Sequence, residues 1–398
     1  MLAEGCDPHS MMNTYLMNAS TDSIDPVHGN VLTPTDSKNV AARVNVQVVR
    51  PHSLCGPLLE DWERIRKSKP VFASPYFDVE FTKAVGRVRD DVRIAIAEND
   101  GDIVGILPFQ EHKRGHAVPV GGLLNDWHGV MGDQSPAILE KILKASKLKS
   151  FKFHAIDNSN DGLKKFYFRE FNSHYLDLSN GWEEYRKWAF KNSSTIKRQG
   201  QKTRGLGREV GEVRFEFESE DPLLLERLIE LKRARYQNAD TFDILGVPWA
   251  SDVLREIHRI REPNFRGVLS ALWAGDELIG CHFGMLTKGI LHYWFPVYDP
   301  QYHRYSPGTE MLMQSAKSAC DSGIRKLDLG YGDDAYKFKF CNAHEPVAFG
   351  LVNFNSFSRI VAKQRYTFRN QLKQIPMKPL AKRILRTIYP HFGGWNFR

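Results

Sequence analysis

The chain has 398 residues, 42% of them hydrophobic and 26% charged, a composition typical of proteins that fold around a large core. It contains no run of 18 apolar residues, and its first 30 residues lack the apolar stretch of a secretory signal, so we expect neither a spanning helix nor export. Five scattered cysteines without a Cys-x-x-Cys pair exclude a zinc ribbon or a disulfide framework, and we expect no bound metal and a cytoplasmic setting.

The net charge of +8 is concentrated at the C-terminus. The segment 346–398 contains ten Lys and Arg residues and no acidic residue, whereas the first 345 residues carry 45 basic and 47 acidic residues. Because the main part of the chain is close to neutral, the charge argues against nucleic acid as a partner. Residues 1–43 are polar and lack apolar periodicity, and we expect a disordered arm there.

Residues 44–180 follow the order β-α-α-β-β-β-α-β-α-β. The first predicted strand is Val44–Arg50, and helices are predicted to begin at Pro57 and at Ser74-Pro75, where residues common in a first helical turn occur. The other predicted elements are strands at Val92–Glu98, Asp102–Gln110 and Ala117–Leu123, a helix at Pro136–Ser146, a strand at Phe151–Asp157, a helix at Asp161–Phe168 and a strand at Ser173–Leu178.

Residues 181–355 largely repeat this order after a linking helix from Trp182 to about Arg204. The other predicted elements are a strand at Val213–Glu218, helices at Pro222–Asn238 and Trp249–Ile260, strands at Gly267–Trp273, Glu277–Leu286 and Ile290–Val297, a helix at Gly308–Ser322, and strands at Lys326–Gly330 and Pro346–Phe354. A Gly-Asp hairpin recurs at the same place in each half, at Gly101-Asp102 and Gly275-Asp276. The repeat predicts an α/β protein of the α+β type with two similar mixed-sheet domains, 44–180 and 181–355.

The turn before the helix at Gly308 has the composition of an anion site. It reads His303-Arg304-Tyr305-Ser306-Pro307-Gly308-Thr309 and follows the strand that ends at Val297. A glycine-containing turn at a helix start presents free backbone N–H groups, which suit a pyrophosphate. The element order and this turn resemble the GNAT acyltransferase fold and its pyrophosphate loop, although Arg304 and Gly308 are one residue further apart than usual. The resemblance implies acetyl-CoA as acyl donor, bound by Val297, Arg304, Ser306, Gly308 and Thr309.

A second motif is Asp328-Leu329-Gly330-Tyr331-Gly332-Asp333-Asp334-Ala335-Tyr336-Lys337. Together with Ser74-Pro75-Tyr76-Phe77, it resembles CelD-type acetyltransferases, which are named for a cellulose-biosynthesis protein and are similar to FemAB transferases in pairing two GNAT-like domains. Asp328, Gly332, Asp333, Tyr336 and Lys337 match the family pattern, and Asp334 replaces its usual glutamate. The resemblance implies acyl-CoA-dependent N- or O-acyl transfer to a sugar or polysaccharide-biosynthesis intermediate.

Acyl transfer requires a base for the acceptor proton, donors for the developing oxyanion and an acid for the leaving thiolate. The candidate catalytic residues are Asp328 as base or lysine partner, Tyr336 as proton donor, Lys337 as positive charge and His292 as base, with His303 as an alternative base. An ion pair between Asp328 and Lys337 that only holds the loop on the sheet is the competing interpretation.

The first half has Gly121–Gly129 at the position equivalent to the pyrophosphate turn. It lacks the Arg-x-x-x-Gly-Thr arrangement and carries the bulky Trp127, so we do not expect it to hold CoA. Domain interfaces commonly contain ligand sites. We therefore expect acceptor-binding side chains at the cleft between the halves: Asn125, Asp126, His128, Asp333 and Asp334. An ordinary polar loop around a buried tryptophan is the alternative.

Two basic segments remain. The first lies on the linking helix, at Lys197, Arg198, Lys202, Arg204 and Arg208, and would contact a phosphorylated acceptor, CoA or tRNA, or only solvent. The second, 356–398, interleaves basic and apolar residues, so it is predicted to form amphipathic helices that bind an anionic inner-membrane surface or pack on the second domain. The competing functions are therefore a FemAB-like aminoacyl-tRNA-dependent transferase and a non-catalytic adaptor in exopolysaccharide assembly.

Overall fold

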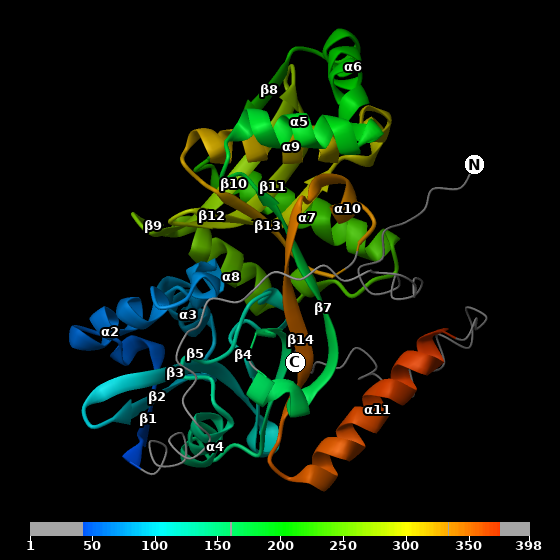
Figure 1. Cartoon of the computed structure of the whole chain (residues 1–398). Coiled ribbons are helices and arrows are strands. Elements are labelled where there is room, and N and C mark those ends of the chain that lie inside the picture. The colour runs from blue at the N-terminus through cyan, green and yellow to red at the C-terminus, as the bar shows by residue number, and fades with distance from the viewer. Residues whose placement is uncertain (1–42, 160, 333, 375–398) are drawn as a thin grey trace.

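The computed structural model describes residues 43–159, 161–332 and 334–374, and its two halves share one large mixed sheet (Figure 1). The arm predicted at 1–43 lies outside the described residues except for Arg43, and so does the tail beyond Gln374. No described helix is long and apolar enough to cross a bilayer.

The first half contains β1 to β7 and α2 to α4. Its strands are β1 (Asn45–Val49), β2 (Val92–Asn99), β3 (Asp102–His112), β4 (His116–Pro119), β5 (Met131–Gly132), β6 (Ser150–Asp157) and β7 (Tyr167–Asp177). Its helices are α2 (Pro57–Arg66), α3 (Val79–Val88) and α4 (Pro136–Ala145).

The second half begins at α5. Its helices are α5 (Trp182–Asn192), α6 (Ser194–Glu209), α7 (Pro222–Asn238), α8 (Pro248–Arg259), α9 (Pro307–Asp321), α10 (Lys337–Phe340) and α11 (Ser356–Gln374). Its strands are β8 (Val213–Glu216), β9 (Arg261–Glu262), β10 (Phe265–Ala274), β11 (Glu277–Thr287), β12 (Ile290–Tyr298), β13 (Lys326–Tyr331) and β14 (Ala343–Val352).

The two halves exchange their last strands. The main sheet order is β1-β2-β3-β4-β6-β14-β7-β13-β12-β11-β10-β8, so β14 from the end of the second half lies between β6 and β7 of the first. Strand β7 in turn pairs with β13, so it lies between β14 and β13 of the second half. This exchange makes the sheet continuous across the boundary that the sequence places near residue 180, and it fixes the two halves against each other.

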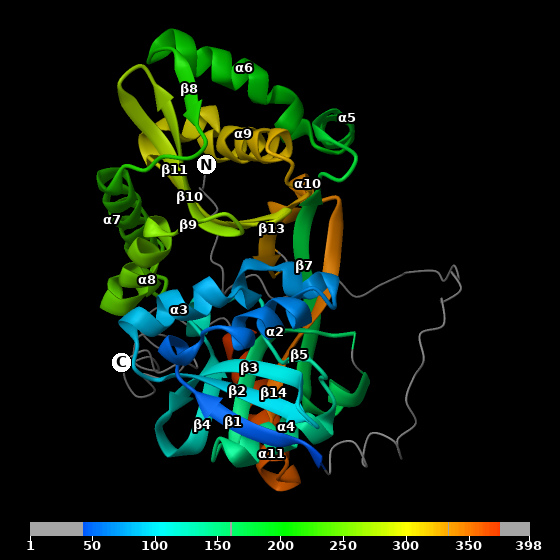
Figure 2. The same ribbon diagram turned by 90° about the vertical axis from the view of Figure 1, so that its left-hand side faces the viewer.

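Helices cover both faces of the sheet. In the second half α5 and α9 pack on one face and α7 and α8 on the other, while α6 crosses beyond α9 (Figure 2). The largest core cluster continues from α7 and α8 into α2 and α3 of the first half, where Trp62 and Phe81 are fully buried. Burial of such apolar area, at roughly 25 cal/mol per Å², is the main force that joins the halves.

Most predicted elements are confirmed, and the differences have local causes. The helix expected at Ser74-Pro75 is only a 3₁₀ turn, because the carboxylate of Asp78 accepts the Glu80 N–H and starts α3 four residues later. The linking helix is broken at Ser193, which is extended and caps α6. Strand β7 begins six residues before the predicted Ser173, because β14 pairs with its first part.

Candidate functional site

The site begins where β12 and β13 separate. These parallel strands pair only at Ile290–His292 with Lys326–Asp328, although β12 continues to Tyr298. Beyond His292, β12 has a strand neighbour on one side only, which is β11. Backbone groups on the other side of β12 therefore do not bond to a neighbouring strand, so an extended ligand with amide groups could pair with them.

A β-bulge marks the same point. Tyr293 and Trp294 together oppose the single residue Gly284 of β11, because the register moves from Phe283–Phe295 to Met285–His292. Gly284 is required there, since a Cβ at this position would clash with the carbonyl oxygen of His292. A bulge bends the strand that carries it, and this one lies where β12 separates from β13.

A buried cluster of charged side chains lies at this point. The Nε2 atom of His292 is 3.3 Å from Oδ2 of Asp126, and its Nδ1 atom is 3.5 Å from Oδ2 of Asp328. The side chains of His292 and Asp328 are 1% and 2% exposed, whereas that of Asp126 is 22% exposed. Asp126 comes from the first half and the other two from the second, so the cluster exists only because the halves meet.

Asp328 is held by neutral donors as well as by the histidine. Its Oδ1 accepts the Gly330 N–H at 2.9 Å, and its Oδ2 accepts the indole N–H of Trp127 at 3.1 Å. A carboxylate with two such donors is oriented and stabilised in its ionised form. Asp328 therefore contacts His292 at the buried end of the cluster, while Asp126 forms the end that reaches solvent.

The charges of the cluster are coupled. Burial disfavours the imidazolium, but the two carboxylates outweigh it and raise the pKa of His292 to about 9. Burial also opposes ionisation of Asp328, but the hydrogen bond and the charge of His292 prevail and hold its pKa below the usual range. At neutral pH His292 is therefore an imidazolium, and it lies between the side chains of Asp126 and Asp328.

Aromatic rings surround the cluster. The ring of Tyr76, from the Ser74–Phe77 motif, lies edge-on to His292 with 5.0 Å between centroids, and 6.0 Å from Trp294. Burial raises the pKa of Tyr76 well above its usual value, and the charges of Asp126 and Asp328 add to this effect. Burial and the Asp126 charge raise the pKa of Tyr331 in the same way, so both phenols are neutral.

The two ends of the Asp328–Lys337 motif have different contacts: Asp328 belongs to the charged cluster, and Lys337 holds the loop after β13. Lys337 is 3% exposed, and its amine donates to the carbonyl oxygens of Gly330 and Tyr331 at 3.0 and 2.7 Å and lies 3.7 Å from Asp334. Its contacts fix the loop after β13, and the ion-pair partner of Asp328 is His292 rather than Lys337. Tyr336 is exposed at the start of α10, and Asp333 lies outside the described residues.

Asn125 and His128 are used within their own loop. The Asn125 side chain donates to the Val120 carbonyl and accepts the Trp127 N–H. Asn125 and His128 are both buried. His128 Nε2 accepts the N–H of His154, and burial lowers the pKa of His128 well below its usual value. Among these three predicted acceptor residues, the structure brings Asp126 to the cluster, and the other two shape the loop that carries it.

The predicted anion turn lies at the start of α9. Ser306 adopts a left-handed conformation before Pro307, and its hydroxyl accepts a hydrogen bond from the Lys202 amine of α6 at 2.6 Å. Arg304 is exposed and paired with Glu209 of α6 at 2.7 Å. Gly308 and Thr309 occupy the first helical turn, and Val297 is buried at the end of β12. Lys202 therefore adds a positive charge at the positive end of the helix dipole.

A second amine lies at the free side of β12. Lys232 of α7 donates to the carbonyl oxygen of Pro296 at 2.9 Å, with its amine over the rings of Tyr236 and Phe295. Burial lowers the pKa of Lys232 to about 7. Sequence reasoning missed Lys232, Tyr76 and Trp127 as members of this region; only the Ser74–Phe77 motif pointed to one of them.

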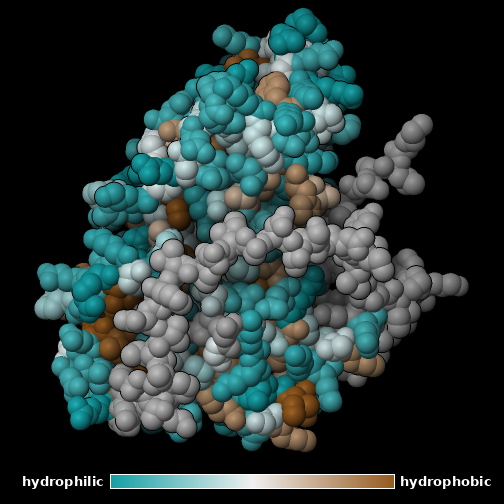
Figure 3. All heavy atoms as spheres, in the orientation of Figure 1, coloured by the Kyte–Doolittle hydropathy of each residue, from teal (hydrophilic) through white to brown (hydrophobic). Residues whose placement is uncertain are grey.

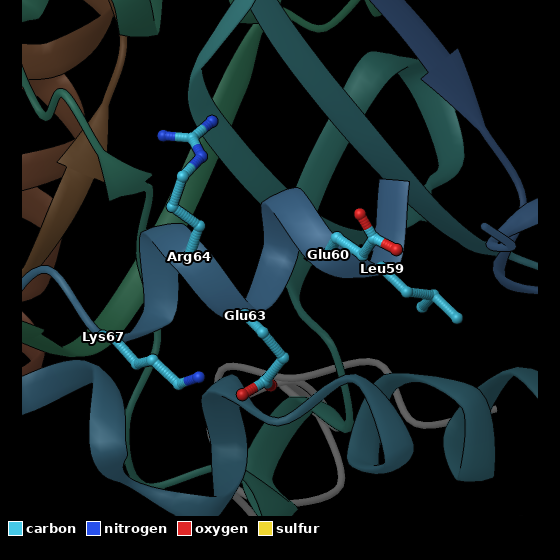
Figure 4. A pocket seen from close by; sticks show the side chains of 5 residues that line it. All are labelled: Leu59, Glu60, Glu63, Arg64 and Lys67. Carbon is cyan, nitrogen blue, oxygen red and sulfur yellow. The ribbon is translucent and has the colours of Figure 1, made fainter. Parts of the chain in front are cut away.

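A shallow hollow of about 590 Å³ lies on α2 of the described surface, and no residue of the cluster lines it. Arg64 points away from Glu63 and Lys67 there (Figure 4), and it forms a local ion pair with Asp61 at 2.7 Å. The hollow is lined by Leu59, Glu60, Glu63, Arg64 and Lys67. No group of His, Cys, Asp and Glu that could hold a metal ion occurs among the described residues.

The mixed sheet and the separation of β12 and β13 define a GNAT-like α/β fold. Residues 193–338 match the family described as acetyltransferase (GNAT) domain, so the second half carries a domain of this kind. No curated protein sequence matches the chain.

Comparison with solved structures gives matches at low sequence identity. The chain is similar to FemX, with 12% identity, a TM-score of 0.53, and coverage of 78% of this chain and 99% of FemX. It also aligns with the C-terminal domain of a protein from Agrobacterium fabrum assigned as a lysylphosphatidylglycerol synthetase (14% identity, TM-score 0.49, 78% and 95% covered). A tandem GNAT protein from the clavulanic acid biosynthesis pathway aligns at 9% identity and TM-score 0.44, with 78% and 98% covered.

Proposed function

We propose that this protein transfers an acyl group, most simply acetyl, from acyl-CoA to an amine or hydroxyl of a sugar or polysaccharide-biosynthesis intermediate. The observation that carries the proposal is the Asp126–His292–Asp328 cluster at the separation of β12 and β13, beside the residues that match a GNAT acetyltransferase domain. The acyl-transfer chemistry follows from this location, and the sugar acceptor follows from the CelD resemblance alone.

The residues present fit the donor. The pantetheine arm of acyl-CoA is extended and contains amides, which suit the unpaired side of β12 beyond His292. Its pyrophosphate suits the start of α9, where the helix dipole, the Gly308 backbone and the Lys202 amine supply positive charge. The thioester would then lie near the bulge at Tyr293 and Trp294, next to the charged cluster.

The chemistry assigns a different task to each residue of the cluster. The acceptor attacks the thioester carbonyl, and the carbon–sulfur bond breaks as the thiolate leaves. Asp126 has the carboxylate that reaches solvent, so it accepts the acceptor's proton. His292 and Asp328 are positioning residues that orient Asp126. Unpaired N–H groups of β12 can donate to the oxyanion as it develops.

Acetyl-CoA is expected to stabilise the folded protein, because a ligand that binds only the native state adds about 2.7 kcal/mol at 100 times its Kd. The measurement is thermal unfolding with and without the ligand. Lys202→Glu places a negative charge at Ser306 and is expected to weaken binding about tenfold, or ~1.4 kcal/mol. Lys197→Glu, an exposed change on the same helix, is the matched control.

Absence of any shift at millimolar acetyl-CoA would contradict the acyltransferase. If tRNA bound under those conditions, the exposed basic residues of α6 would instead support an aminoacyl-tRNA-dependent transferase. If neither donor bound, the protein would be an adaptor.

We also propose that α11 binds an anionic membrane surface. Phe357, Ile360 and Phe368 are exposed on one face of the helix, and the exposed Lys363 and Arg365 flank it. Figure 3 shows hydrophobic surface over the lower end of α11, next to hydrophilic residues. The opposite face is anchored, because the ring of Tyr366 stacks on Phe349 at 4.7 Å.

Binding to vesicles that contain anionic lipid is expected to be strong for the wild type and largely lost in the triple variant F357S/I360S/F368S, because three apolar side chains no longer enter the interface. Cosedimentation measures it, and neutral vesicles are the control. Equal binding by the variant would show that α11 does not carry the contact.

A further inference from the structure

The side of β12 that faces away from β11, here called the open side, can be assigned residue by residue. In an antiparallel pair, successive residues alternately point their backbone groups toward the partner strand and away from it. The Asp299 N–H donates to the carbonyl of Ile279, which lies opposite it just beyond the ladder of β11 and β12. Val297, two residues back, therefore also points toward β11, and its carbonyl oxygen lies 2.9 Å from the place of a Cβ on Gly280. Pro296, between these positions, points its backbone to the open side.

The residue at position 296 gives the open side an acceptor but no donor. Proline has no backbone N–H, so Pro296 presents only its carbonyl oxygen there. An extended ligand with amide groups needs both kinds of partner, because each of its carbonyls requires a donor once water is displaced. At the level of Pro296 the backbone of β12 cannot supply that donor.

The amine of Lys232 lies at this position. It reaches from α7 and donates to the Pro296 carbonyl oxygen at 2.9 Å, so it is on the open side of β12. The rings of Tyr236 and Phe295 hold it there, with 5.4 and 5.9 Å between its nitrogen and the ring centroids. Among the described residues the bond to Pro296 is its only hydrogen bond, and its side chain is partly exposed.

The amine has hydrogens left for a ligand. Burial lowers the pKa of Lys232 to about 7, so both the ammonium and the neutral amine are present near neutral pH. Either form keeps at least one N–H after the bond to Pro296 is made. A side-chain donor therefore lies where the backbone of β12 has none.

We propose that Lys232 binds acyl-CoA by replacing the N–H that Pro296 lacks, and that its amine donates to an amide carbonyl of the pantetheine arm. This inference rests on the proposed function, which places that arm along the open side of β12. The Pro296 carbonyl is already bonded to the amine, so the arm is held at this level through its own carbonyl. Lys232 then contributes to affinity for the arm and takes no part in the chemistry at the charged cluster.

Two probes locate the contact on the arm. Acetyl-CoA contains the pantetheine arm, whereas adenosine 3′,5′-bisphosphate contains only the nucleotide, and calorimetric titration measures the Kd of each. Lys232→Met keeps an apolar stem but has no N–H, so it is expected to raise the Kd for acetyl-CoA about tenfold, the usual effect of one hydrogen bond. The Kd for the bisphosphate should stay within about twofold of the wild-type value. Arg227→Met, at an exposed position of α7, is the matched control and should change neither Kd.

A rescue variant tests the reason for the contact. Pro296→Ala restores a backbone N–H on the open side, so the double variant K232M/P296A is expected to recover most of the affinity for acetyl-CoA that Lys232→Met loses. An unchanged or tighter Kd in Lys232→Met would overturn the proposal, because the amine would then miss the arm or block it. Equal weakening of both probes, or no recovery in the double variant, would overturn it as well. Failure of acetyl-CoA to bind the wild type would instead overturn the proposed function.

Discussion

Replacing His292 by glutamine is expected to lower the turnover number by about 10²–10⁴-fold, because it releases the proposed base Asp126 and a positioned base usually contributes that much. The imidazolium lies between Asp126 and Asp328, and in the proposed function it holds the carboxylate that faces the acceptor. Glutamine retains a donor and similar size but no positive charge. Steady-state kinetics with saturating acetyl-CoA measures the loss, and circular dichroism checks the fold.

His303→Gln is the control for this experiment. His303 is exposed in the turn before α9, and among the described residues its ring makes no contact with the cluster, so the variant should retain wild-type turnover. If His303→Gln were inactive and His292→Gln active, the reaction would take place at the start of α9 rather than at the strand separation.

Replacing Asp328 by alanine is expected to lower the free energy of unfolding by about 3–5 kcal/mol, because breaking a buried ion pair leaves an uncompensated charge. The indole N–H of Trp127 and the backbone N–H of Gly330 lose their acceptor at the same time. Urea unfolding measures the change. Asp328→Asn keeps an acceptor oxygen and should cost less, and Asp321→Ala, which removes an exposed ion pair with Lys317, should leave the free energy of unfolding almost unchanged.

The ion pair of His292 and Asp328 also makes the free energy of unfolding depend on pH. The pKa of His292 in the folded protein, about 9, lies above its unfolded value near 6.5, so its stabilising contribution is complete below about pH 6.5 and is lost as the pH rises through about 9. The pKa of Asp328 is lowered, so its contribution is present above about pH 4 and is lost as the pH falls through the folded value. Unfolding curves from pH 4 to 10 should show the alkaline decline in the wild type and a smaller one in Asp328→Ala. An unchanged decline in that variant would assign it to other groups.

The sequence by itself determined the local elements. Helix α7 begins and ends where the sequence predicts, at Pro222 and Asn238, because Asp221 caps it and the apolar residues recur at helical spacing. Most strands up to β13 follow from alternation and from the Gly-Asp hairpins, although the short β5 and β9 were not predicted, and the element order resembled the GNAT fold in each half. The candidate residues Asp126, His292 and Asp328 were also found in the sequence, although it did not link them.

The tertiary structure alone decided which of these residues meet. Trp127 and Asp328 are 201 positions apart, and their hydrogen bond depends on how the halves pack. The partner expected for Asp328 was Lys337, nine residues away, but Lys337 instead reaches the carbonyls of Gly330 and Tyr331. The insertion of β14 between β6 and β7 also has no local signal in the sequence. A strand can pair with any strand edge of matching length whose buried face lies on the same side of the sheet. Periodicity records which face of an element is buried, but not which distant element covers it.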